Sequence, residues 1–147
     1  MREKKVTTQL FAVLQANHHS SDRMQSERFV DGETVYKDLG YDLESLKKQD
    51  PGYENTCAVR MSAALLLSGV PITGRLRVKA SPLKGRYIEP GAKLLADQLS
   101  RTLGRPQVLM PSEASKKLEG QQGVVFFWKM PDYAGGHIDL IQVHNSS

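Results

Sequence analysis

The feature that most constrains this chain is a segment of apolar residues that runs almost without interruption from Met61 to Leu67. Polar turn-forming residues precede it and Gly69 follows it. Asn55 or Thr56 can accept a hydrogen bond from the first free N–H groups of a helix, and a glycine can adopt the left-handed conformation that ends one. The segment therefore predicts a helix that is apolar on nearly all sides, and such a helix belongs in the interior of a fold.

The only cysteine of the chain, Cys57, lies in the first turn of this expected helix. The partial positive charge at a helix N-terminus favours a thiolate over a thiol. Most free cysteines are small buried apolar residues, and that role stays open here. The position at the helix N-terminus nevertheless favours a nucleophile, provided that a histidine lies near it.

Composition limits the class of protein. The 147 residues suffice for one domain with an ordinary hydrophobic core. A single cysteine excludes an internal disulfide and a thiolate-rich zinc site, and we expect neither a metal nor a cofactor. No stretch approaches the roughly 20 apolar residues of a membrane span, and no secretory signal follows the charged N-terminus. We therefore expect synthesis in the cytoplasm without a signal peptide, and no membrane partner.

The net charge of +4 and the isoelectric point near 9.2 favour an anionic partner. The densest group of basic residues lies between Arg75 and Arg86, without aromatic residues among them. This pattern signals nucleic-acid binding only weakly, so we predict none. A polyanionic polymer such as a bacterial cell wall fits the charge, and so does the solvated face of a strand.

The remaining elements follow from periodicity and turn residues. We expect helices over 6–17, from Pro90 to Gly104 and over 112–119, and strands within 70–79, 107–110, 123–129 and 137–144. Residues 23–52 look irregular, and the adjacent His18 and His19 are expected to be exposed rather than to bind a metal. The result is an α+β fold. Its buried helix, in the N-terminal half, carries Cys57 and packs on an antiparallel sheet with 123–129 as a central strand.

A histidine and an aspartate that can complete a catalytic site lie on the last expected strand. Residues two apart on a strand project from the same face, so His137 and Asp139 share a side. A cysteine hydrolase needs a thiolate, a base that returns the proton to the leaving group, and a group that orients the base. Cys57, His137 and Asp139 supply these three, and N–H groups at the start of the Cys57 helix would stabilise the oxyanion.

Two further residues are predicted to contact the substrate. Gly136 lets the backbone approach the reacting groups closely, because it has no side chain. Arg60, on the same side of the helix as Cys57, can bind a substrate carboxylate or hold a structural ion pair. His137 also fits a satisfied core histidine, and Asp139 fits a loop brace as well as it fits catalysis.

Three segments resemble a known family. They are 55–65 (NTCAVRMSAAL), 123–127 (GVVFF) and 136–140 (GHIDL). In this order and spacing they resemble the type VI secretion amidase effectors of the fourth family. Segments 10–18 and 86–106 are similar as well, so the resemblance covers most of the chain.

The resemblance implies a papain-like cysteine peptidoglycan amidase of the NlpC type, with residues 1–147 as a single domain. Cys57 would be the nucleophile and His137 the general base and acid. Such effectors are secreted by the type VI needle into the periplasm of rival bacteria. There they cleave the bond between γ-D-glutamate and meso-diaminopimelate in stem peptides and crosslinks. The implied partners are peptidoglycan, the needle components and a cognate immunity protein that plugs the active-site cleft.

The chain departs from the family in two places. An acidic third catalytic residue is expected further beyond the histidine, past Ser147, and the usual Trp after the Asp-Leu pair is Ile141 here. Three explanations are open. Asp139 orients His137, or the natural protein is longer and the domain lacks a C-terminal segment, or the chain is a weakened or incomplete enzyme.

Two other functions fit the same residues. One is a papain-like hydrolase or deamidase that acts on a protein target. The other is a non-catalytic binding module, in which Cys57 is part of the core and the basic face binds a polyanion or a partner. Thiol reactivity separates the last from the enzymes, because a buried structural thiol alkylates slowly.

Overall fold

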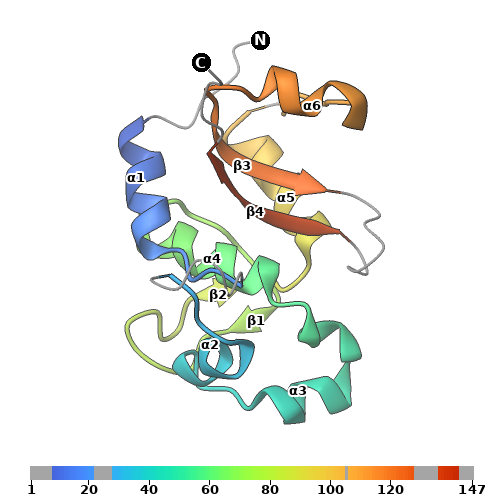
Figure 1. The fold of residues 1–147 in the computed structure, drawn as a ribbon. Helices are drawn as coiled ribbons and strands as arrows, with labels where there is room; N and C mark the ends of the chain where they lie inside the picture. The colour runs from blue at the N-terminus through green and yellow to red at the C-terminus, as the bar shows by residue number, and fades with distance from the viewer. Residues whose placement is uncertain (1–7, 22–27, 105, 128–135, 143–147) are drawn as a thin grey trace.

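The computed structural model describes residues 8–21, 28–104, 106–127 and 136–142. Helices occupy most of the N-terminal part, and two short antiparallel sheets complete the fold (Figure 1). This mixture of helices and antiparallel strands confirms the predicted α+β class. Among the described residues, no helix has both the length and the apolar composition that crossing a bilayer requires.

The predicted interior helix is α4, Cys57–Leu67, and the fold buries it almost completely. The buried positions lie on all sides of the helix: Cys57, Ala58, Val59, Arg60, Met61, Ser62, Ala64, Leu65 and Leu66. Met61 and Leu65 expose no surface. Each fully buried side chain of this kind contributes roughly 1.5–3 kcal/mol relative to an exposed one, so α4 is the main source of core packing.

Gly69 ends α4 as predicted. Its φ of 84° lies in the left-handed region. The N–H of Gly69 donates to the Leu66 carbonyl, and the N–H of Val70 donates to the Leu65 carbonyl at 2.8 Å. These two bonds form a Schellman motif, which satisfies the last free carbonyls of the helix.

The elements that pack most extensively on α4 are α1 (Thr8–Asn17), α5 (Ala92–Thr102) and β4 (His137–Gln142). β4 pairs antiparallel with β3, Gln122–Phe127. Figure 1 shows the β3–β4 hairpin above α4, with α1 at one side. The packing therefore brings the start of β4, late in the chain, onto the helix that begins with Cys57.

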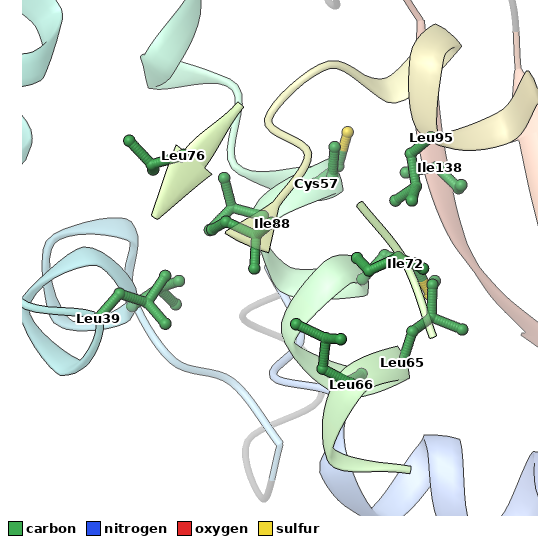
Figure 2. Packing of buried hydrophobic residues seen from close by; sticks show 14 of the residues in the cluster. Leu39, Cys57, Leu65, Leu66, Ile72, Leu76, Ile88, Leu95 and Ile138 are labelled. Atoms are coloured by element: carbon green, nitrogen blue, oxygen red, sulfur yellow. The ribbon is translucent and has the colours of Figure 1, made fainter. Parts of the chain in front are cut away.

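The buried apolar side chains form one cluster across these elements. Figure 2 shows part of it, with Leu65 and Leu66 of α4, Leu95 of α5 and Ile138 of β4. Cys57, the first residue of α4, belongs to the same cluster. The nucleophile candidate is therefore set in a packed framework rather than on a loop.

The second sheet consists of two antiparallel strands of two residues each, β1 (Leu76–Arg77) and β2 (Tyr87–Ile88). Ser62 of α4 fixes the end of this pair, because its hydroxyl donates to the Glu89 carbonyl and accepts from the Glu89 N–H, both at 3.1 Å. A strand was predicted within residues 70–79, and the structure has only the two residues Leu76–Arg77 in a strand there.

The prediction that residues 23–52 are irregular is wrong for their described part. This part contains α2 (Gly32–Asp38), α3 (Leu43–Gln49) and the start of the 3-10 helix η1 (Pro51–Glu54). An aspartate side chain caps each one by accepting from a backbone N–H: Asp31, Asp42 and Asp50. Helices this short show little periodicity, so the aspartates were the available signal.

Two other differences concern the C-terminal half. Residues 107–110 form no strand, and the predicted 112–119 helix is α6, Pro111–Lys117. In the described part of the chain β3 pairs with β4 alone, so it is not a central strand. An apolar, β-branched run indicates a strand but does not determine how many neighbours it has.

Truncation of one α4 side chain tests this burial. Leu65→Ala should lower the free energy of unfolding by about 2–5 kcal/mol, because it leaves a cavity in the core. Leu67→Ala, at a position that is 42% exposed, should cost less than about 1 kcal/mol. Urea denaturation followed by circular dichroism measures both. Equal losses for the two variants would contradict the assigned orientation of α4.

Candidate active site

Cys57 is the first residue of α4, and its side chain is 5% exposed. Of the two predicted capping residues, Asn55 bonds to the helix N-terminus: its Oδ1 accepts from the N–H of Cys57 at 3.3 Å. Thr56 instead accepts at Oγ1 from Nε of Arg60, at 2.7 Å. The cysteine therefore sits where the helix begins, with its backbone held by the residue two positions before it.

Asn55 also joins the cysteine segment to β4. Its Nδ2 donates to the Gly136 carbonyl at 3.2 Å. Gly136 has a φ of 101°, and a Cβ there would lie 2.7 Å from the Phe127 carbonyl oxygen. The close approach that glycine permits is thus to β3. The contact of Gly136 with substrate stays a prediction.

His137 lies between a carboxylate and a thiol. Its Nε2 is 3.4 Å from Oδ2 of Asp139, as expected for residues on one face of a strand. Its ring stacks on Phe127, with centroids 6.4 Å apart and 12° between the planes. Hydrogen bonding with Asp139 and with Cys57 raises the pKa of His137 to about 9. The site therefore favours an imidazolium at neutral pH.

The Asp139 carboxylate faces two imidazoles. Oδ2 points to His137, while Oδ1 is 3.7 Å from Nε2 of His18 and accepts from the N–H of Leu140 at 2.8 Å. Burial by itself would raise the pKa of Asp139, but hydrogen bonding with His137 and Leu140 holds it below its usual value. The carboxylate is therefore ionised beside both rings.

His18 was predicted to be exposed, and that prediction is wrong. Its side chain is 4% exposed, whereas His19 is exposed as expected. Burial lowers the pKa of His18 to about 4. One sequence signal pointed to this position: Phe11, Leu14 and His18 follow helical spacing, and both apolar residues are buried. The buried face of α1 thus includes His18, which directly follows the last residue of the helix and contacts Asp139.

Arg60 was predicted to contact substrate or to be structural, and its contacts favour the second role. The side chain is 4% exposed. Its Nη1 donates to the carbonyls of Ser20 at 2.9 Å, of His19 at 3.3 Å and of Val30. With Nε bonded to Thr56, the guanidinium holds the chain after α1 against α4.

The arrangement can carry out nucleophilic chemistry. It combines a thiol at a helix N-terminus, an imidazole close to a carboxylate, and a carboxylate on the same face of the strand, which are the groups that a cysteine hydrolase requires. Within the described ranges, no group of three or more histidine, cysteine or acidic side chains is arranged to hold a metal ion.

A comparison with models of protein families identifies the family of this chain. A family model described as type VI secretion system (T6SS), amidase effector protein 4, matches residues 53–147. The matched stretch contains Cys57, His137 and Asp139 but not His18. A comparison with curated protein sequences finds no significant match.

Solved structures share the fold. The crystal structure of the type VI effector Tae4 from Enterobacter cloacae is 24% identical, with a TM-score of 0.63 over 97% of this chain and 82% of that one. The effector in the Tae4–Tai4 effector–immunity complex from Salmonella Typhimurium is 18% identical, with a TM-score of 0.61, over 97% of this chain and 84% of that one. At these identities the likeness establishes the fold.

The imidazoles of His137, which is partly buried, and His18, which is buried, should give opposite pH dependences of stability. His137 has a pKa of about 9 when folded, against 6.5 for an ordinary histidine, so its contribution is complete below about pH 6.5 and is lost as the pH rises to about 9. His18 has a pKa lowered to about 4, so the unfolded chain takes up the proton first and stability falls as the pH drops from 6.5 to about 4.

Urea denaturation across this pH range measures both effects. His137→Gln should flatten the profile on the basic side only, and His18→Gln on the acidic side only. Each variant is the control for the other. A profile that neither substitution changes would contradict the assigned environments.

The Asn55 bridge is testable with an isosteric change. Asn55→Asp keeps the acceptor for the Cys57 N–H but replaces the Nδ2 donor with an oxygen that faces the Gly136 carbonyl. We expect a loss of about 1–3 kcal/mol in the free energy of unfolding. We also expect slower alkylation of Cys57, because β4 is no longer held to the cysteine segment. Alkylation at the wild-type rate would show that Asn55 does not position the two groups.

Proposed function

The chain belongs to the family of type VI secretion system amidase effector protein 4, and from this membership we propose that it is a cysteine amidase that hydrolyses peptidoglycan. The proposed bond joins γ-D-glutamate to meso-diaminopimelate in stem peptides and crosslinks. The observation that carries the proposal is the position of His137, whose imidazole interacts with both the Cys57 thiol and the Asp139 carboxylate.

The first half-reaction forms a thioester. The proton of Cys57 resides on His137, so that the sulfur is a thiolate beside an imidazolium. The thiolate attacks the carbonyl carbon of the γ-D-glutamyl amide, and the carbonyl oxygen becomes an oxyanion. As the C–N bond breaks, His137 gives its proton to the diaminopimelate nitrogen, which leaves as an amine.

The second half-reaction releases the acyl group. His137, now neutral, takes a proton from a water molecule, and the resulting hydroxide attacks the thioester carbonyl. The C–S bond breaks, and the γ-carboxyl group of D-glutamate is released. The thiolate and imidazolium are thereby restored, so the net reaction consumes one water per amide.

The start of α4 is the proposed oxyanion site. Helix N-termini present free N–H groups and a partial positive charge. The N–H of Cys57 is held at a long 3.3 Å by Asn55, and an oxyanion is a stronger acceptor than that amide oxygen. Binding of the transition state can therefore recruit this N–H.

Asp139 is the proposed third catalytic residue. Its Oδ2 lies 3.4 Å from the His137 nitrogen, and the partly buried, ionised carboxylate stabilises the imidazolium. We propose that the site is papain-like and of the NlpC type, which is supported by a buried helix that carries the thiol and an antiparallel sheet that carries the imidazole. On this proposal residues 1–147 act as one cysteine amidase domain.

Membership of the family supports a proposal for the biological setting. We propose that the protein is made in the cytoplasm, is secreted through interactions with type VI needle components, and acts in the periplasm of a target bacterium. The effector–immunity complexes of the Salmonella relatives support a cognate immunity protein as a partner. The positive net charge of +4 suits an anionic cell-wall polymer.

One observation favours the non-catalytic alternative, in which Cys57 only packs. The side chain is 5% exposed and belongs to the hydrophobic cluster. A thiol paired with His137 should alkylate rapidly at about pH 6–7, whereas a packed, neutral thiol should not.

Digestion of purified diaminopimelate-type peptidoglycan tests the proposed function. The wild type should release fragments that end at D-glutamate, identified by mass spectrometry, and Cys57→Ala should release none because the nucleophile is gone. Thermal unfolding of both proteins controls for folding. Digestion by both proteins, or by neither although both are folded, would reject the proposal.

A further inference from the structure

His18 is a buried titratable residue that has no part in the proposed reaction steps. His18 lies just after α1, outside the 53–147 segment that the family model matches. Its Nε2 is 3.7 Å from Oδ1 of Asp139, the carboxylate whose other oxygen faces His137. A buried imidazole so close to a catalytic carboxylate calls for a physical explanation, because burying a polar ring without a partner is costly.

The chain holds His18 in place from both sides. On one side, Nδ2 of Asn17 donates to Oγ of Ser68 at the end of α4, at 3.1 Å. On the other, Nη1 of Arg60 donates to the carbonyls of His19 and Ser20. Ser68 and Arg60 thus hold the residues before and after His18 against α4. These contacts fix the position of the imidazole relative to the catalytic groups.

The surroundings of His18 keep its ring neutral. The charged groups that face it are Asp139 from β4, Arg60 from α4 and Arg28 from the segment before α2, with His19 next to it in the chain. Asp139 is the only negative one among them. The Nδ1 atom of His18 is buried without a hydrogen-bond partner among the described residues, so a second proton on the ring would have no acceptor there. The single proton belongs on Nε2, facing the carboxylate.

This proton restricts the carboxylate. At 3.7 Å the contact is longer than a hydrogen bond, and it acts as an attraction between the Nε2–H dipole and the charged oxygen. The N–H of Leu140 donates to Oδ1, the His18 ring attracts the same oxygen, and Oδ2 is left for His137. Without His18, the Asp139 side chain could turn away from His137 toward solvent, because it is 37% exposed.

We propose that His18 is a positioning residue for the amidase site, whose neutral imidazole orients Asp139 and, through it, His137. This inference rests on the proposed function, because it assigns His18 to the same reaction. It also gives α1 and the residues that follow it a part in catalysis, although they lie outside the matched family segment.

Three variants of the full chain test the inference. His18→Phe keeps a flat ring but removes the donor, and His18→Gln keeps an N–H donor that does not titrate. His19→Phe is the matched control, since it places the same change on the exposed neighbour. If His18→Phe does not fold, His18→Leu replaces it. Hydrolysis of a soluble γ-D-glutamyl–meso-diaminopimelate stem peptide gives kcat and KM, and thermal unfolding reports folding.

The expected result separates positioning from structure. His18→Phe should lower kcat about tenfold with KM within about twofold, because the base is misplaced while the binding surface is intact. His18→Gln and His19→Phe should stay within about threefold of the wild type. In a background of Asp139→Asn the His18→Phe change should lose its effect, since His18 acts through Asp139.

The pH dependence of iodoacetamide alkylation of Cys57 gives a readout without substrate. For the wild type we expect a transition near pH 9, where His137 loses its proton. In His18→Phe this transition should move to lower pH, because a less well oriented carboxylate stabilises the imidazolium less. In His18→Gln it should stay in place.

Three outcomes would overturn the inference. In the first, His18→Phe keeps the wild-type kcat and alkylation profile. In the second, His18→Phe and His18→Gln lose activity equally with an unchanged profile and a lower Tm, which marks a purely structural residue. In the third, the wild type itself shows neither hydrolysis nor the upper transition, and then the proposed function fails as well. Wild-type activity with an unaffected His18→Phe refutes only the role of His18.

Discussion

The rest of the structure depends on the burial of α4. This helix is apolar on nearly every side, so it is stable only when other elements enclose it, and α1, α5 and β4 do so. Its first residue is Cys57, and its enclosure by β4 brings His137 to the same end of the helix. Core packing and site assembly are therefore one event. A change that loosens α4 from β4 should separate the thiol from the imidazole before it unfolds the chain.

Charge sets the chemistry within this packed frame. The single Asp139 carboxylate lies between two imidazoles whose pKa values move in opposite directions. His137 has its pKa raised by Asp139 and Cys57, which favours a protonated ring at neutral pH, whereas burial among positive groups lowers the pKa of His18, which favours a neutral ring. The environment alone thus gives two chemically identical side chains different roles.

Sequence reasoning predicted the parts of this arrangement that depend on local chemistry. The run to Leu67 and the glycine after it predicted α4, and strand alternation placed His137 and Asp139 on one face. It missed what depends on tertiary contacts. The burial of His18 and the direction of the Arg60 guanidinium are fixed by segments far away in the chain, and short helices such as α2 and α3 leave too little periodicity to detect.

The most direct test of this account is an NMR titration of the histidine rings in the wild type and in Cys57→Ala. The account predicts that His137 titrates near pH 9, that this value falls when the thiol is removed, and that His18 takes up no proton above about pH 5. If His137 and His18 instead both titrate near 6.5 in the folded protein, and Cys57→Ala changes neither, the thiol, imidazole and carboxylate do not form the proposed site.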